Sequence, residues 1–215
     1  LNNLQKGAIR SAARIANQLP GELIRVLIDK IEKQLVDKME YTVIYKFYEA
    51  IAPSVQKYIA EKLQINMPVE FSHGWTTKIK EMLKDITVDS YDEVKGRLEY
   101  FVRDKYDDYM FGNISWQRLK GLLSYVPVIN VFERQNEAPM FLDFIEAAAK
   151  CPDSYFSAYI IGEKRPDERL SIDGIFIPAE CESQIIHLLR QAKSVFDEFS
   201  VININGKNYV YMWWD

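Results

Sequence analysis

The chain has 215 residues, of which 48% are hydrophobic and 27% are charged, and it contains only 9 glycines and 8 prolines. These proportions are typical of a folded globular protein and exclude a disordered, collagen-like or linker-dominated chain. The net charge of −4, and a sequence without an apolar run of about 18 residues, argue against nucleic acid and a membrane as partners.

The N-terminal part has the strongest helical periodicity. A helix is predicted over residues 4–18, and a second pattern runs through residues 23–51 with apolar side chains at every fourth position. Pro53 then predicts a kink or break, because proline removes one helical hydrogen bond. A stripe this long packs inside its own subunit or binds another protein or a second copy of the chain, and internal packing is the commoner case. The interface candidates are Leu23, Leu27, Ile31 and Leu35.

The middle of the chain is predicted to be mostly helical. Ser90 and Glu93 form a capping box, which satisfies backbone N–H groups at a helix start. The apolar, β-branched run at residues 127–132 predicts a buried strand. Helices are predicted over residues 76–86, 90–109, 114–125 and 139–150.

The C-terminal part is rich in β-strand signals. Residues 155–161 and 170–177 are predicted to form two strands joined by a charged loop. Asn205–Gly206 joins two more β-prone runs, and Asn-Gly favours a hairpin because a type I′ turn needs positive φ at both residues. A two-residue turn places Ile202 opposite Tyr209. With one helix between them, the two hairpins form a predicted ββαββ unit.

We therefore expect the α+β class. A mainly helical portion covers residues 1–150, and a β-hairpin/helix/β-hairpin unit covers residues 151–215. The two portions can also pack as one compact domain.

The cysteines indicate the compartment. Cys151 and Cys181, with only His73 and His187 beside them, are too few for a zinc site, and no cofactor is indicated. Buried free thiols are the default in a chain of this size and favour the reducing cytoplasm, although one disulfide is geometrically possible. On a helix after Pro178, Cys181 faces the core and His187 faces solvent.

The tripeptide His73-Gly74-Trp75 lies in a predicted loop. A histidine and a tryptophan beside a glycine can line a pocket, so His73 and Trp75 are pocket candidates. The structural alternative is that Trp75 packs in the core and His73 bonds a local carbonyl group.

An acidic group lies at the end of the helix predicted over residues 90–109. Asp104 and Asp108 are spaced by four residues and can share a divalent cation with Asp107, because hard cations prefer carboxylate oxygens. The alternative is an ordinary charged helix surface, since Arg103 and Lys105 lie between these residues.

The C-terminal strands also carry many aromatic side chains. Such rings can stack on nucleic-acid bases, but the acidic surroundings and the strand alternation favour a core or an interface. These residues are Tyr155, Tyr159, Phe176, Tyr209, Tyr211 and Trp213.

The sequence has no diagnostic catalytic or phosphate-binding motif. The leading hypothesis is a non-catalytic protein-interaction or regulatory module, whose partner is another protein or a second copy of the chain. The alternative is an enzyme, with or without a divalent metal, whose site is assembled from dispersed residues around His73 and the Asp104–Asp108 cluster.

Overall fold

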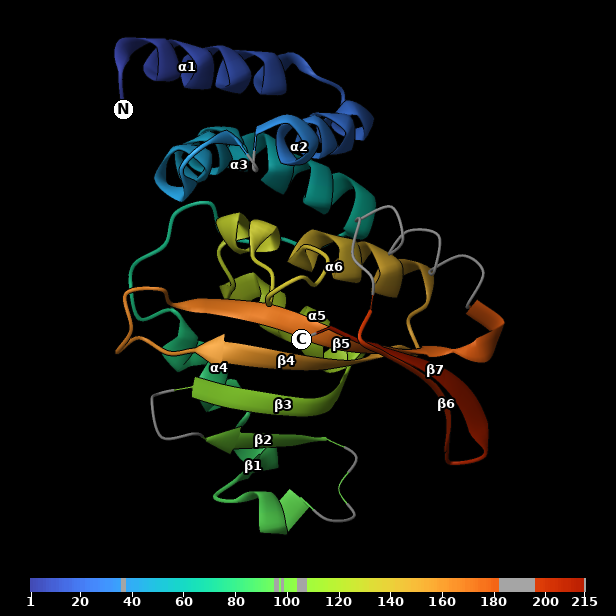
Figure 1. Cartoon of the computed structure of the whole chain (residues 1–215). Helices are drawn as coiled ribbons and strands as arrows, with labels where there is room; N and C mark the ends of the chain where they lie inside the picture. Colours follow the sequence, from blue (N-terminus) through green and yellow to red (C-terminus); the bar gives the residue numbers. More distant parts are fainter. Residues whose placement is uncertain (36–37, 95–96, 98, 104–107, 182–195, 215) are drawn as a thin grey trace. The chain divides into compact units, whose positions relative to one another are not determined.

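The computed structural model describes residues 1–35, 38–94, 97, 99–103, 108–181 and 196–214 (Figure 1). The chain belongs to the α+β class, as predicted, and combines helices with a mixed seven-stranded sheet. Its contacts divide it into two compact units, Leu1–Glu70 with Pro127–Ile129, and Phe71–Val126 with Asn130–Asp215. This division differs from the helical and β-rich portions suggested by the sequence.

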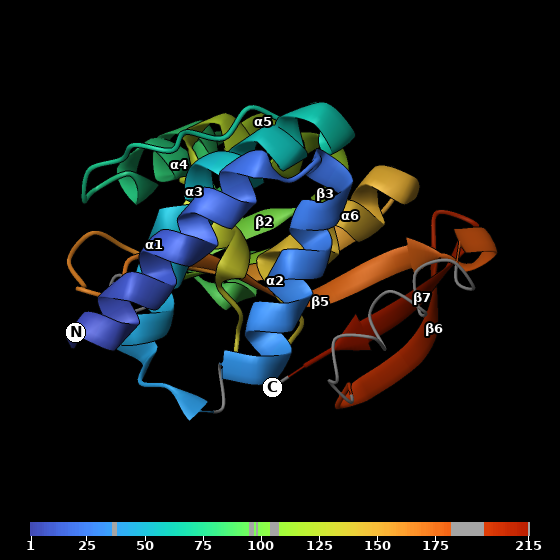
Figure 2. The same ribbon diagram turned by 90° about the horizontal axis from the view of Figure 1, so that it is seen from above.

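The first unit is built from α1 (Asn3–Gln18), α2 (Gly21–Leu35) and α3 (Tyr41–Leu63). Helix α1 starts with a capping box, in which Asn2 and Gln5 each accept the other's backbone N–H at 2.8 Å. Helices α1 and α2 form the two arms of a V in Figure 2, and both pack on α3. Among the described helices, none is long and apolar enough to cross a membrane.

The apolar stripe predicted over residues 23–51 is divided between two helices, because α2 ends at Leu35 and α3 begins at Tyr41. Folding back lets one half of a long stripe pack against the other half within the same unit. Of the kink or break predicted at Pro53, the break is wrong, since α3 continues through this residue. Pro53 lies on the exposed side of α3, where water can bond the carbonyl group that proline leaves unpaired.

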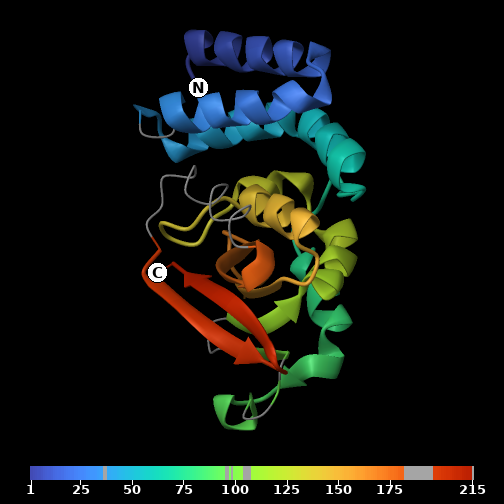
Figure 3. The ribbon, with the colours of Figure 1, turned by 90° about the vertical axis from the view of Figure 1, so that its right-hand side faces the viewer.

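The second unit contains the sheet, with strand order β1-β2-β3-β4-β5-β7-β6. Strands β1 and β2 are parallel, and all other neighbours are antiparallel. Figure 3 shows the β6–β7 hairpin in red. The strands are β1 (Thr87–Val88), β2 (Tyr100–Arg103), β3 (Asp108–Ser115), β4 (Tyr155–Ile161), β5 (Arg169–Pro178), β6 (Glu198–Ile204) and β7 (Lys207–Trp213).

Helices α5 (Trp116–Leu122) and α6 (Phe141–Lys150) pack on one face of this sheet. Phe144 of α6 meets Trp214 edge-on at 5.5 Å between ring centroids, and Trp116 of α5 meets Phe156 of β4 at 6.4 Å. Burial of these large rings stabilises the core of the unit. The unit also contains α4 (Thr76–Met82), which a 3-10 turn at Lys84–Ile86 follows.

The helix predicted over residues 90–109 is wrong. A short 3-10 helix, Tyr91–Val94, directly follows Ser90, and β2 and β3 come after it. The rings of Phe101 and Phe111 on these neighbouring strands stack at 4.8 Å, and both are buried. Packing of alternate side chains on the sheet therefore outweighs the local signal for a helix.

The strand predicted at residues 127–132 is also wrong, because Val128–Phe132 is a 3-10 helix. The side-chain amide of Asn130 takes over the pairing with β5. It donates to the carbonyl oxygen of Leu170 at 2.8 Å and accepts the Leu170 N–H at 2.9 Å. Both backbone groups are thereby satisfied without another strand.

Both C-terminal hairpins pair as predicted. Ile202 lies opposite Tyr209, and the turn has positive φ at Asn205 and Gly206. The separate ββαββ unit is wrong, however, because β4 pairs with β3 and all these strands belong to one sheet. The helix predicted after Pro178 falls largely on residues 182–195, which lie outside the described residues, as does His187.

The expectation of free thiols is wrong, because Cys151 and Cys181 form a disulfide. Cys151 follows the last residue of α6, and Cys181 ends the 3-10 turn after β5. The fold brings the end of α6 next to the end of this 3-10 turn. The separation of 30 positions in the sequence does not reveal that the two cysteines are neighbours. The argument for a reducing compartment rested on free thiols and loses its basis.

We expect reduction of this disulfide to lower the free energy of unfolding by roughly 3 kcal/mol, because a loop of thirty residues is no longer closed in the unfolded chain. Urea unfolding with and without reductant measures the difference. A variant with Cys151→Ser and Cys181→Ser should already be at the lower value and should not respond to reductant. Equal stability of the reduced and oxidised wild type would contradict the prediction.

Candidate functional site

The sheet face opposite α5 and α6 carries seven aromatic side chains, which we call the aromatic face. Side chains alternate along a strand, so the strand registers place these residues on one side. Five of them are half-buried, and only Phe176 and Tyr209 are buried. The aromatic face comprises Tyr100, Tyr155, Tyr159, Phe176, Tyr209, Tyr211 and Trp213.

The rings of the aromatic face pack on one another. Tyr211 stacks on Phe176 with 4.3 Å between centroids, and Tyr155 meets Tyr209 edge-on at 5.7 Å. Contacts of this kind fix ring positions and add stability beyond the burial of area. These two ring pairs join residues of β4, β5 and β7.

Two glycines allow rings to lie close to the backbone. A Cβ atom added at Gly112 would come within 2.0 Å of the Tyr100 ring, so Tyr100 lies across the backbone of β3. At Gly174, a Cβ would meet the rings of Tyr211 and Trp213, each at 3.3 Å. Any larger residue at Gly112 would displace the Tyr100 ring.

Two irregularities in strand pairing flank Ser157 at the centre of the sheet. The β4–β5 register shifts between Ser157 and Ala158, and the extra residue on β5 is Asp173. The β3–β4 register shifts between Phe111 and Ile114, where Asn113 has a φ of 47°. Bulges redirect side chains and are frequent beside functional sites. Here the bulge in β5 turns Asp173 towards the aromatic face.

Asp173 is a buried carboxylate, 3% exposed, among these rings. Its Oδ2 accepts the indole N–H of Trp213 at 2.9 Å. Burial, and then the charge of Asp173, raise the pKa of the Tyr100 hydroxyl. Burial first, and then Asp173 and Glu198, also raise the pKa of Tyr211. The phenols therefore stay neutral at physiological pH.

A groove of about 500 Å³ lies beside Tyr155. Its Glu99 carboxylate accepts the backbone N–H of Ser115 at 2.7 Å and binds Arg118 at 3.0 Å. Arg118 also binds Asp85 at 3.0 Å, so one cation faces two carboxylates. The groove is lined by Ile86, Arg97, Glu99, Ser115 and Tyr155.

The pocket candidate His73 lies on a second polar cluster. Its Nδ1 is 3.0 Å from the Glu168 carboxylate, and its Nε2 is 2.5 Å from the backbone carbonyl oxygen of Glu163. Glu168 is nearly buried and also accepts the backbone N–H groups of Gly74 and Thr76, at 2.7 and 2.9 Å. These bonds tie the loop before α4 to the β4–β5 loop.

The structure gives His73 an anchoring arrangement. Both ring nitrogens face acceptors, and only the doubly protonated ring can donate to both at once. The carbonyl partner differs from the local one expected in the structural alternative for His73, because Glu163 lies 90 positions away in sequence. Trp75 is half-buried at the start of α4.

The metal candidates are described only in part. Asp104 and Asp107 lie outside the described residues, and the side chain of Asp108 is not described. Asp108 is the first residue of β3, so its predicted place late in a helix is wrong. In the part of the chain that the structure describes, no group of three or more His, Cys, Asp or Glu residues is arranged to hold a metal.

The interface candidates on α2 have different exposures. Ile31 is buried at 4% exposure, whereas Leu23 is 43% exposed, and Leu27 and Leu35 are half-buried. Val26, which the four-residue spacing did not select, is 47% exposed. Leu23 and Val26 are therefore the exposed large apolar side chains of this helix, and the interface on it remains a prediction.

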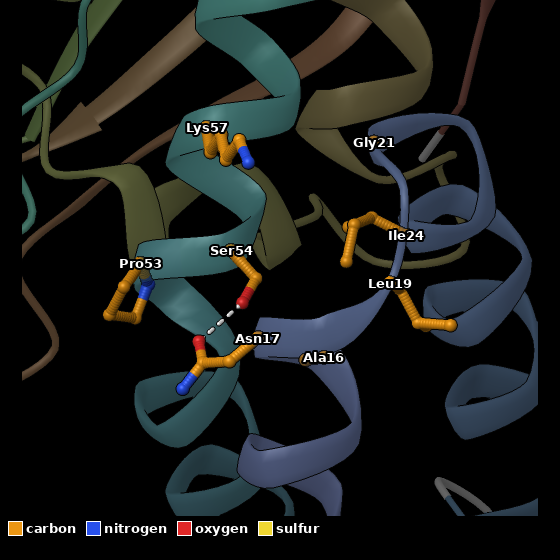
Figure 4. A pocket seen from close by; sticks show the side chains of 8 residues that line it. All are labelled: Ala16, Asn17, Leu19, Gly21, Ile24, Pro53, Ser54 and Lys57. Atoms are coloured by element: carbon orange, nitrogen blue, oxygen red, sulfur yellow. Dashed lines mark hydrogen bonds between the residues drawn. The ribbon is translucent and has the colours of Figure 1, made fainter.

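A cavity of about 90 Å³ lies in the first unit (Figure 4). The hydroxyl group of Ser54 donates to Oδ1 of Asn17 at 2.9 Å across its edge. A space of this size holds at most a few water molecules. Its other lining residues are Ala16, Leu19, Gly21, Ile24, Pro53 and Lys57.

Six of the seven aromatic-face residues could be named from the sequence. The seventh, Tyr100, and the acidic residue Asp173 beside these rings were missed. Tyr100 was assigned to a helix. For Asp173 a signal was present, because Asp-Gly interrupts the alternation of a β-prone run and such a glycine often marks a bulge.

The Lys80–Glu163 ion pair beside His73 should make stability depend on pH. Burial alone raises the pKa of Glu163, but the hydrogen bond and charge of Lys80 outweigh it and lower that pKa below 4.5. The stabilisation is therefore present above pH 4.5 and is lost on acidification. In Lys80→Met, the difference in unfolding free energy between pH 7 and pH 3 should shrink by about 1 kcal/mol.

The matched control is Lys84→Met, because Lys84 is exposed in the turn that follows α4. Chemical unfolding at both pH values should show the same pH difference for this variant as for the wild type. An unchanged difference in Lys80→Met would show that Lys80 does not hold the charge of Glu163.

Comparison of the chain with protein-family models, with curated proteins and with solved structures finds no match in any of the three. Function is therefore inferred from the geometry of the described residues. Two polar centres stand out among them, the Asp173 carboxyl group within the aromatic face and the His73–Glu168 pair before α4.

Proposed function

We propose that the chain is a non-catalytic protein-interaction module that binds another protein or a second copy of itself through the aromatic face. One observation carries the proposal. Seven aromatic side chains lie on one sheet face, while the rings of Trp116 on α5 and Phe144 on α6 contact rings on the other side of the sheet.

The chemistry of these residues supports a binding surface. Tyrosine and tryptophan are enriched in protein interfaces because they give a large contact area at a small cost in side-chain entropy. Tyr211 is held by its stacking on Phe176, so little freedom is left to lose on binding. The neutral hydroxyl groups of Tyr100 and Tyr211 can also bond a partner.

The exposed side chains of α2 offer a second surface for the same function. Leu23 and Val26 are both more than 40% exposed on a helix whose other face is buried. Isolated exposed apolar residues are common, however, and need no partner. The aromatic face is the better candidate because its side chains are contiguous and fixed by ring contacts.

The His73–Glu168 pair favours the alternative function, an enzyme. A buried carboxylate that orients an exposed imidazole is an arrangement found in general acid–base catalysis. The other ring nitrogen already faces the Glu163 carbonyl, so His73 must release this loop before it can reach a substrate. The interaction function does not need such a rearrangement.

Removal of one ring from the aromatic face tests the proposal. Tyr211→Ala should lower the amount of partner captured from an extract of native cells at least tenfold, because aromatic residues at interface centres often contribute 2 kcal/mol or more. Quantitative mass spectrometry of the captured proteins measures the change. The matched control is Tyr125→Ala, because Tyr125 is 39% exposed and lies outside the aromatic face.

Two other results would oppose the proposal. If Leu23→Asp removes the partner and Tyr211→Ala does not, the interface is on α2. If no protein depends on either residue, light scattering of the purified chain decides whether the partner is a second copy. A wild-type monomer at all concentrations, with no face-dependent partner, would exclude an interaction through this face.

A further inference from the structure

The part of the aromatic face next to the edge strand β6 combines rings with carboxyl groups. Trp213 lies between Asp173, whose Oδ2 accepts its indole N–H, and Glu198, which is its direct partner on β6. Asp173 is buried and Glu198 is exposed. One indole ring is therefore flanked by two acidic residues from the neighbouring strands.

Resting on the proposed function, we propose that this site binds an arginine side chain of a partner peptide, with the guanidinium group over Trp213, beside the exposed Glu198 and above the buried Asp173.

Arginine fits this arrangement better than other groups. A guanidinium group stacks on the face of an aromatic ring and donates hydrogen bonds in its plane to carboxylates. Trp213 supplies the ring, and Glu198 supplies an exposed acceptor. The charge of Asp173 acts from beneath the rings, where little water screens it.

The charges around the face also favour a cationic partner. Lys207 contacts both Asp153 and Glu180, at 2.9 and 3.0 Å, so this cation is outnumbered by carboxylates. Arg118 beside the groove is likewise bound to two carboxylates. The group around Lys207 therefore carries a net negative charge, whereas Arg97 in the groove offsets the two carboxylates bound by Arg118. Phosphate groups would be repelled, which argues against a nucleic acid on these rings.

The readout uses the indole N–H signals of the four tryptophans in a two-dimensional ¹H–¹⁵N NMR spectrum. Trp213→Phe identifies the signal of Trp213. Trp116 and Trp214 are buried in the core and report on folding during the same titration. The probe is a blocked peptide of five arginines and two glycines. Matched peptides with lysine or glutamate, and a twelve-residue oligothymidylate, are the comparison ligands.

We expect the arginine peptide to shift the Trp213 signal saturably and to leave Trp214 unchanged. The lysine peptide should bind several-fold more weakly, because an ammonium group stacks less well on a ring. Asp173→Asn, which keeps an oxygen for the indole N–H, should weaken arginine binding about tenfold. The exposed Glu198→Gln should weaken it several-fold and keeps the test valid if Asp173→Asn does not fold. The control is Glu137→Gln, an exposed residue between the 3-10 helix Val128–Phe132 and α6.

Other outcomes would overturn the inference. The first is the absence of a saturable shift with the arginine peptide. The second is that Asp173→Asn and Glu198→Gln both bind this peptide as tightly as the wild type does. The third is a stronger response to oligothymidylate than to the arginine peptide. A partner captured through Tyr211 but unaffected by Asp173→Asn and Glu198→Gln would leave the interaction function standing and reject only the arginine site. If no partner is captured through Tyr211 and the arginine peptide does not bind, the interaction function itself is rejected.

Discussion

The structure of the second unit depends on side-chain alternation in a sheet that has one buried face. Phe156, Ile175 and Met212 point to the side that α5 and α6 cover, and each is fully buried. Their neighbours along the strands must then point to the opposite side. The same residues that build the core thus decide that Tyr155, Phe176 and Tyr211 form an aromatic layer on the other face.

Asp173 is where this alternation is interrupted. Ile172 and Ile175 both enter the core, so the two residues between them have to be accommodated by a bulge. A buried carboxylate is costly unless it is bonded, and the indole N–H of Trp213 is one of its partners. The bulge places a carboxyl group among the rings of the aromatic face, which is why the site has a different chemistry from an ordinary hydrophobic interface.

Polar side chains hold the loops of this unit in place. Asn130 satisfies both backbone groups of Leu170, and Glu168 accepts backbone N–H groups at the start of α4. The disulfide between Cys151 and Cys181 joins the ends of α6 and β5. His73 belongs to the same group of anchors, since both of its nitrogens face acceptors from the β4–β5 loop.

The sequence by itself determined the elements whose signals are local. Helix α1, strands β4 and β5, and the hairpin at Asn205–Gly206 follow from periodicity, alternation and turn chemistry, and six residues of the aromatic face could be named in advance. Only the tertiary structure decided that residues 100–103 form a strand, because Phe101 is stabilised there by Phe111 from another strand. Three other features likewise join residues that are distant in sequence. They are the pairing of Cys151 with Cys181, the bonds of Glu168 to the loop before α4, and the place of Asp173 between the rings. Their positions depend on how the strands are ordered in the sheet, and no local pattern of residues encodes that order.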